Sequence, residues 1–216
     1  YASGMDTVAI NKQGLTPLQP EFDRIAAIKT VADVARAVAV QQTYGSGALF
    51  GLYVGQDEKK SDVQALHLYQ GGLGLPNRDY YFKTDERTKR IRDEYVKHVA
   101  RMFELMGDAP AVATRNSRTV MTIETSLAKA SRKLEDLRDP YANYNKMSVA
   151  GLGKLAPAVD WRKMMADVHA VGVDSVIVGQ PEFFKAVQAN LKSVSVPDWQ
   201  TYLRWHLVTN FASSLS

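Results

Sequence analysis

The sequence predicts a mainly α-helical fold, a multi-helix domain with one small antiparallel β-hairpin at about residues 48–69. Apolar residues recur every three to four positions through most of the 216 residues, which is the period of an amphipathic helix. In one stretch the period becomes two, and two short runs rich in aromatic and β-branched residues flank a polar connection. Amphipathic helices joined by short loops bury their apolar faces only by packing on one another, which favours the mainly α class.

The first part of the chain carries start and stop signals for short helices. Residues 5–12 have the pattern of the tail of a helix, which Gly14 closes. Pro20 suits the first turn of the next helix, because an N–H group has no helical partner there. Thr30 and Asp33 have the spacing of a capping box and predict the start of a third helix, which the next glycines end.

The predicted hairpin consists of residues 48–54 and 63–69, joined by the polar residues 56–62. In the second run apolar and polar positions alternate. His67 falls among the apolar positions, so we expect a half-buried, hydrogen-bonded histidine. The short apolar run Ser175–Val178 is the only other strand signal.

Two long helices are predicted in the middle of the chain. Residues 85–106 have a continuous apolar stripe, and Gly107 has the conformational freedom that helix C-termini use. The second helix begins at Pro110 and carries an apolar stripe as far as Leu134. Residues 138–140, Arg-Asp-Pro, are expected to end it, because the residue before a proline avoids helical backbone angles.

The last third predicts four further helices, each with a capping residue or a proline at its start: Ser148, Asp160, Pro181 and Ser195. The last of them carries apolar residues from Trp199 to Leu215, and no Gly, Asn or Pro follows to end it. We therefore expect the chain to be a piece of a longer polypeptide. The alternative is a complete protein with frayed ends.

Composition excludes several classes of protein. The chain has no cysteine, which excludes disulfides, a thiolate nucleophile and Cys-ligated zinc or iron–sulfur sites. Its net charge of +4 comes from 27 cationic and 23 anionic residues mixed along the chain, whereas nucleic-acid-binding proteins concentrate their cations on one face. No apolar stretch approaches the roughly 20 residues that span a bilayer. We therefore expect no nucleic-acid partner and no membrane contact from this segment.

The histidines form no recognisable metal motif. A catalytic zinc needs three protein ligands, and the sequence contains no His-Glu-x-x-His pattern. The four histidines are scattered along the chain: His67, His98, His169 and His206. We expect no metal ligand among them.

Other chemically capable residues also have structural interpretations. Residues 71–76 are rich in glycine but lack the spacing and the following Lys-Ser/Thr of a phosphate-binding loop, so we expect a turn after the hairpin. Glu124 lies among apolar neighbours, which favours a structural salt bridge over acid–base catalysis. Arg138 and Asp139 are expected to form hydrogen bonds at a helix end. Taken residue by residue, the sequence predicts no catalytic, cofactor-binding or metal-binding residue.

Residues 73–81 contain a distinctive motif, Leu-Gly-Leu-Pro-Asn-Arg-Asp-Tyr-Tyr. It resembles the Gly-Leu-Pro-x-Arg-Asp-Tyr-Tyr signature of the neprilysin and endothelin-converting-enzyme family of zinc metallopeptidases. Further segments similar to that family occur in family order over nearly the whole chain: 50–57, 123–128, 138–148, 179–183, 199–205 and 212–216. Each segment alone is weak, but together they are specific.

This resemblance implies a position within a larger protein. The 216 residues resemble the middle of the N-terminal half of a bacterial-type member, since animal members are disulfide-bonded and this chain has no cysteine. In the family that half is mostly helical, packs over a thermolysin-like catalytic half and encloses a chamber that admits peptides and excludes folded proteins. The family's zinc ligands, a His-Glu-x-x-His helix and a downstream Glu, lie in the C-terminal half. Its upstream substrate-binding arginines lie before Tyr1.

Residues 1–216 are thus expected to belong to the N-terminal helical lid of a zinc-dependent metalloendopeptidase, with the catalytic domain absent from this chain. The implied partners are the C-terminal catalytic domain of the same protein and peptide substrates, and zinc is bound outside this chain. The segment alone is expected to be inactive. The alternative is a standalone, non-catalytic helical binding module. The resemblance favours a periplasmic or extracellular protein, although some members are cytoplasmic.

Overall fold

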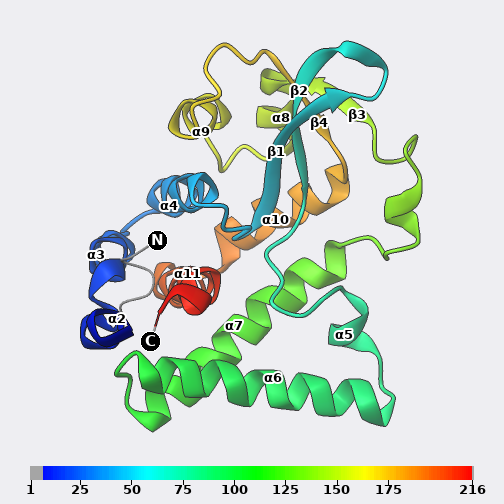
Figure 1. Cartoon of the computed structure of the whole chain (residues 1–216). Coiled ribbons are helices and arrows are strands. Elements are labelled where there is room, and N and C mark those ends of the chain that lie inside the picture. Colours follow the sequence, from blue (N-terminus) through cyan, green and yellow to red (C-terminus); the bar gives the residue numbers. More distant parts are fainter. Residues whose placement is uncertain (1–6, 216) are drawn as a thin grey trace.

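The computed structural model describes residues 7–215 and confirms the mainly helical class (Figure 1). The helices are α2 (Thr7–Gln13), α3 (Gln19–Ala26), α4 (Val31–Thr43), α5 (Asp79–Phe82), α6 (Glu86–Leu105), α7 (Pro110–Ala130), α8 (Val149–Leu155), α9 (Trp161–Asp167), α10 (Pro181–Ser193) and α11 (Val196–Phe211). Short 3₁₀ helices are η1 (Thr16–Leu18), η2 (Asp136–Arg138) and η3 (Ala212–Ser214). Of the helix predicted at residues 5–12, Met5 and Asp6 lie outside the described residues. No described helix is both long and apolar enough to cross a bilayer.

Four strands form one mixed sheet in the order β1-β2-β4-β3. They are β1 (Phe50–Asp57), β2 (Lys60–Gln70), β3 (Asn145–Ser148) and β4 (Ser175–Val178). The predicted hairpin is confirmed as the antiparallel pair β1 and β2, but it is only part of the sheet, because β4 pairs parallel to β2 and antiparallel to β3. Both hairpin strands continue through the expected polar connection to a turn at residues 58–59.

The sequence pattern identifies β4 but misses β3. β3 is four residues long, and its last residue, Ser148, is also the N-cap of α8 and accepts a hydrogen bond from the backbone N–H of Gly151. The capping signal of Ser148 therefore predicts the helix α8 and gives no indication of the strand before it. β3 forms because β4, about thirty residues later in the sequence, offers it an edge, and Asn145 and Ser148 pair with Val178 and Ser175.

The predicted helix starts are confirmed by their capping contacts. Thr30 and Asp33 form the full capping box at the start of α4. At α9, the Asp160 carboxylate accepts a hydrogen bond from the backbone N–H of the third helical residue, and at α11 the Ser195 hydroxyl does the same. Each cap provides an acceptor for an N–H group that the helix itself cannot satisfy.

Two predicted helix ends are wrong. The helix from Pro110 ends at Ala130 rather than at residues 138–140, and Leu134 lies on a loop with 52% of its surface exposed. The chain leaves the helix because Ser131 adopts an extended conformation and the N–H of the next residue donates to a side chain at the end of β2. The last helix ends at Phe211, and η3 replaces its expected final turn.

The sheet and most helices share one hydrophobic core. Phe50 of β1 packs against Trp161 of α9 and Phe184 of α10, with ring centroids 5.7 and 5.5 Å apart. Helix α6 lies along the lower edge of the view in Figure 1, and α7 packs against it and rises diagonally in that view. A second cluster, which includes Phe103 and Trp205, lies between these two helices and α11. In a third cluster, Leu75 of the loop that follows β2 is buried with Tyr81 of α5 and Ala128 of α7.

Candidate functional site

The histidines do not come together as a metal site. They lie on four separate segments: β2, α6, the loop after α9, and α11. Within residues 7–215, no group of three His, Asp or Glu side chains is placed to hold a metal ion. The described residues therefore offer no ligand set of the kind that a catalytic zinc requires.

His67 differs from its prediction. It is buried rather than half-buried, and its Nε2 has no hydrogen-bond partner among the described residues. The reason is its cross-strand neighbour Tyr53, whose ring stacks on the imidazole at 4.5 Å between centroids. The nearest charged group is Glu58, whose carboxylate oxygen lies 3.7 Å from His67 Nδ1.

Glu124, in α7, is fully buried and held by two phenols. Tyr81 Oη donates to its Oε2 at 2.7 Å, and Tyr95 Oη lies 2.9 Å from both carboxylate oxygens. We call these three side chains the Glu124 hub. Burial, with the adjacent carboxylate, raises the pKa of both tyrosines, so their hydroxyls stay protonated and keep donating. The sequence predicts a salt bridge for Glu124, whereas its closest partners are phenols rather than a basic side chain.

The hub continues into α11. Trp205 Nε1 donates to Tyr95 Oη at 3.1 Å, and His206 Nε2 lies 3.5 Å from Glu124 Oε1. One turn earlier, the buried Tyr202 has its ring 4.2 Å from that of His206. The network therefore links α6, α7 and α11 with the loop after β2.

The glycine-rich loop at residues 71–78 lies directly on this network. Gly74 passes so close that an added Cβ would lie 1.9 Å from Tyr95 Oη. Gly72 has a φ of +72° and would bring a Cβ to 2.4 Å from Tyr202 Oη, which itself donates to the Gly72 carbonyl at 2.8 Å. Glycine is therefore required at both positions by close approach to phenol oxygens.

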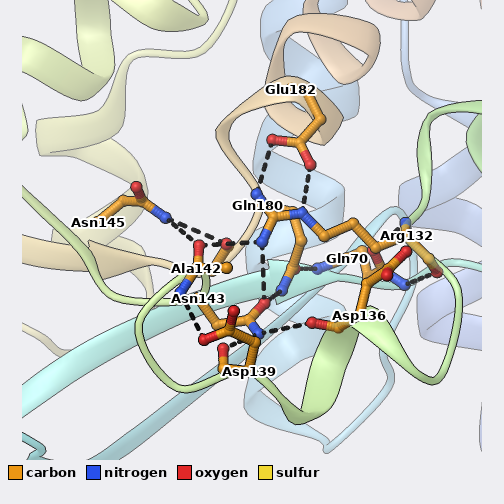
Figure 2. Close-up of polar contacts among 10 residues, drawn as sticks. Gln70, Arg132, Asp136, Asp139, Ala142, Asn143, Asn145, Gln180 and Glu182 are labelled. Atoms are coloured by element: carbon orange, nitrogen blue, oxygen red, sulfur yellow. Dashed lines mark hydrogen bonds and ion pairs between the residues drawn. The ribbon is translucent and has the colours of Figure 1, made fainter.

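A second polar cluster joins the ends of the parallel strands β2 and β4 (Figure 2). Gln70, the last residue of β2, accepts a hydrogen bond from the N–H of Arg132 at 2.7 Å. Gln180, two residues after β4, accepts from the N–H of Gln70 at 2.8 Å and donates to Asn143 at 2.6 Å. The Arg132 guanidinium pairs with the carboxylate of Glu182 at the start of α10. We call these five residues the Arg132 cluster.

The Arg132 cluster was not predicted, although the sequence contains one indication of it. Gln70 and Gln180 are polar residues at or just beyond the carboxyl ends of β2 and β4, and the carboxyl ends of parallel neighbours meet at one edge of a sheet. Asp139 behaves as predicted, since its Oδ1 accepts from the N–H groups of Tyr141 and Ala142 at 2.9 and 3.1 Å. These bonds shape the loop between η2 and β3.

Asp57, next to the hairpin turn, makes side-chain contacts with β3 and with the residue before it. Lys146 Nζ lies 2.7 Å from Asp57 Oδ2, and Tyr144 Oη donates to Oδ1 at 2.9 Å. The hydrogen bond from Lys146, with the one from the Lys59 N–H, lowers the pKa of the Asp57 carboxyl to about 2. The Lys59 ammonium lies 4.4 Å above the Tyr144 ring. These contacts connect the turn end of the hairpin to the segment that contains β3.

A groove of about 390 Å³ separates the glycine-rich loop from the segment that follows α7. Tyr69, Leu73, Leu134 and Leu137 contribute apolar surface to it. Two arginines line it, Arg78 from the loop and Arg132 from the cluster, and no carboxylate does. We call it the Arg78 groove. Its volume is in the range of sites that bind small molecules or short peptide segments.

Residues 1–216 match the sequence profile of peptidase family M13. Neprilysin-3 of Drosophila melanogaster is 30% identical over 188 residues, which are 80% of this chain and 23% of that protein. Human endothelin-converting enzyme 1 is 25% identical over 226 residues, covering the whole chain and 29% of the enzyme. The chain thus spans about a quarter of the length of these curated relatives.

Solved structures agree with this assignment. Zinc metalloprotease Zmp1 of Mycobacterium tuberculosis, in complex with an inhibitor, superimposes with a TM-score of 0.94 at 30% identity. The match covers all of this chain and 33% of the Zmp1 chain. The solved Zmp1 chain is therefore about three times as long as the 216 residues.

Proposed function

Because the chain belongs to peptidase family M13, as part of its N-terminal domain, we propose that it forms the helical wall of the peptide chamber in a zinc metalloendopeptidase. Its task on this proposal is to restrict the size of substrates that reach the reactive centre. The zinc ligands lie on the remainder of the longer polypeptide, the C-terminal catalytic domain.

The observation that carries the proposal is the match to a third of the Zmp1 chain across all 216 residues. The residues themselves are consistent with a division of labour. A zinc endopeptidase needs three protein ligands and a general base at one centre, and residues 7–215 offer no such group. No step of the hydrolysis is therefore assigned to this chain.

A wall that selects by size must keep its shape, and two polar networks support that shape: a buried one around Glu124 and a part-exposed one around Arg132. The Glu124 hub joins α5, α6 and α7, Trp205 connects it to α11, and the loop after β2 packs on it. The Arg132 cluster joins the sheet edge to α10. Buried polar contacts of this kind rigidify a fold, because breaking one of them leaves a polar group unpaired.

The test is a comparison of substrates with the full-length gene product. It should cleave a short unstructured peptide and should leave the same sequence intact when it is embedded in a stably folded protein. Removal of zinc with a chelator should abolish cleavage, and added zinc should restore it. Cleavage of both substrates at similar rates would overturn the role in size selection.

The second candidate, a standalone binding module, predicts a different gene. A stop codon shortly after Ser216 would favour it, whereas a His-Glu-x-x-His motif well downstream supports the peptidase. The absence of a metal-ligand group from residues 7–215 fits both candidates. Reading the intact coding sequence separates them.

A further inference from the structure

The Arg78 groove has a charge pattern that its neighbours lack. Its lining holds two arginines and no Asp or Glu. The adjacent groove at the start of α6 mixes both signs, with Lys83 and Arg87 beside Asp79, Asp85 and Glu135. An anion entering the Arg78 groove therefore meets no fixed negative charge on the lining.

Arg78 is the cation that remains available. Arg132 is already paired with Glu182, and its Nη1 donates to the Ala142 carbonyl at 2.9 Å. Arg78 forms no ion pair within the described part of the chain, and its guanidinium lies 5.6 Å from the centroid of the Phe82 ring. Its Nε is buried without an acceptor among the described residues. A buried donor of this kind is rare in folded proteins and is commonly satisfied by a ligand or an ordered water.

The loop that carries Arg78 is held in place before any ligand arrives. Gly74 rests on the Glu124 hub, and the Leu75 N–H donates to Tyr81 Oη at 3.1 Å. A rigid support lowers the entropy lost on binding, because the cation does not have to be ordered first. The same motif residues that mark the family therefore present an unpaired guanidinium at the groove.

We propose that the Arg78 groove binds an extended peptide segment through the carboxylate of an Asp or Glu side chain, with apolar neighbours of that residue against Tyr69 and Leu134. The guanidinium offers paired donors that match a carboxylate, and the leucines and the tyrosine ring offer apolar contact on either side. This inference rests on the proposed function in one respect, namely that peptides are the ligand class.

The side-chain carboxylate is favoured over a peptide C-terminus by the backbone of the groove. Terminal carboxylates are typically captured by several free backbone N–H groups. Here four of the lining N–H groups, those of Gln70, Gly72, Leu75 and Arg132, already donate to acceptors within the protein and cannot take part in such a capture. The guanidinium of Arg78 is then the donor that an acidic side chain can reach.

The test uses fluorescent pentapeptides blocked at both ends, with sequence Ala-Leu-Glu-Leu-Ala or Ala-Leu-Gln-Leu-Ala, and the full 216-residue chain. Fluorescence anisotropy at low ionic strength should show saturable binding of the Glu peptide and at least about tenfold weaker binding of the Gln peptide. Salt should weaken the Glu complex, because the contact is between charges. Equal binding of the two peptides, or binding of neither, would overturn the inference.

Substitutions in the groove test whether the peptide carboxylate binds at Arg78. Arg78→Gln should reduce affinity for the Glu peptide about tenfold, to the level of the Gln peptide. The matched control Arg115→Gln removes the same charge from an exposed position on α7 and should leave affinity unchanged. Leu134→Glu, at an exposed groove position, should also weaken binding without unfolding the chain. Unchanged affinity in both groove variants contradicts the inference.

A third peptide distinguishes the source of the carboxylate. Ala-Leu-Gln-Leu-Ala with a free C-terminus should bind no better than its blocked form, and preferential binding of the free form would show that the groove takes peptide termini instead. Failure here is separable from failure of the proposed function. The groove is judged by binding to the 216 residues, and the peptidase by zinc-dependent cleavage in the full-length protein.

Discussion

Glu124 acquires its role from residues far away in the sequence. Its position among apolar neighbours predicts a structural salt bridge, and in the structure it accepts hydrogen bonds from two tyrosines. Its partners, however, lie 43 and 29 residues earlier, on α5 and α6, and no local pattern connects them. His67 shows the same limit, since its burial depends on a cross-strand stack with Tyr53. The sequence thus indicated that these two polar side chains lie among apolar neighbours, but it did not identify the residues that contact them.

Tyr95 is the residue at which the hub is tested most cleanly. Tyr95→Phe removes a donor to Glu124 and the acceptor of the Trp205 indole, and leaves the ring volume in place. We expect the free energy of unfolding in urea to fall by about 1–3 kcal/mol, because buried polar groups lose their partners. Tyr141→Phe, at a position 83% exposed, is the matched control and should change stability very little. Equal stability of the two variants contradicts the hub.

Asp57 gives a prediction about pH. Its pKa is about 2 in the folded chain against an ordinary value of 3.8, so its stabilising contribution is complete above about pH 4. The contribution is lost as the pH falls through 2, because the folded state must then take up the proton that it resists. Urea unfolding between pH 6 and pH 2 should show this loss in the wild type and a shallower loss in Asp57→Asn. Asp62→Asn, at an exposed position on β2, should follow the wild type, and a wild-type-like curve for Asp57→Asn would contradict the assignment.

At the scale of elements, local signals predicted helix starts better than helix ends. Thr30, Ser148, Asp160 and Ser195 each cap the helix that the sequence assigns to them. A cap is a contact within four residues, so the sequence contains all of its information. The end of α7 depends instead on Gln70, which takes the N–H of the residue after Ser131 and draws the chain out of the helix. β3 depends in the same way on β4.

The glycine-rich loop is an element whose sequence can be tested directly. Gly74→Ala places a methyl group 1.9 Å from Tyr95 Oη, so the loop or the hub must shift. We expect thermal unfolding to show a loss of about 1–3 kcal/mol, as for overpacked sites. Gly153→Ala provides the control, because an added Cβ there meets nothing within 4 Å. In the interior of α8 that change should stabilise by about 0.5–1 kcal/mol. A Gly74→Ala chain as stable as the wild type would contradict the close packing of loop and hub.

At the scale of the whole molecule, the fold class and the family followed from the sequence, and the sheet did not. The helical period is repeated through most of the chain, and the motif at residues 73–81 is specific. The predictions of fold class and family therefore do not depend on the exact bounds of any helix or strand. The four-stranded sheet needs a parallel pairing between segments about a hundred residues apart, which periodicity does not report. The Arg78 groove depends on the same long-range assembly, since its two walls come from the loop after β2 and the segment after α7.

On the function that we propose, this chain is a non-catalytic helical part of a peptidase whose metal ligands lie elsewhere. Equilibrium dialysis of the 216-residue chain against zinc at neutral pH tests it most directly. We expect only weak, substoichiometric binding of zinc, which does not change when His67 or His206 is replaced by alanine. One tightly bound zinc per chain, lost on substitution of either histidine, would contradict it.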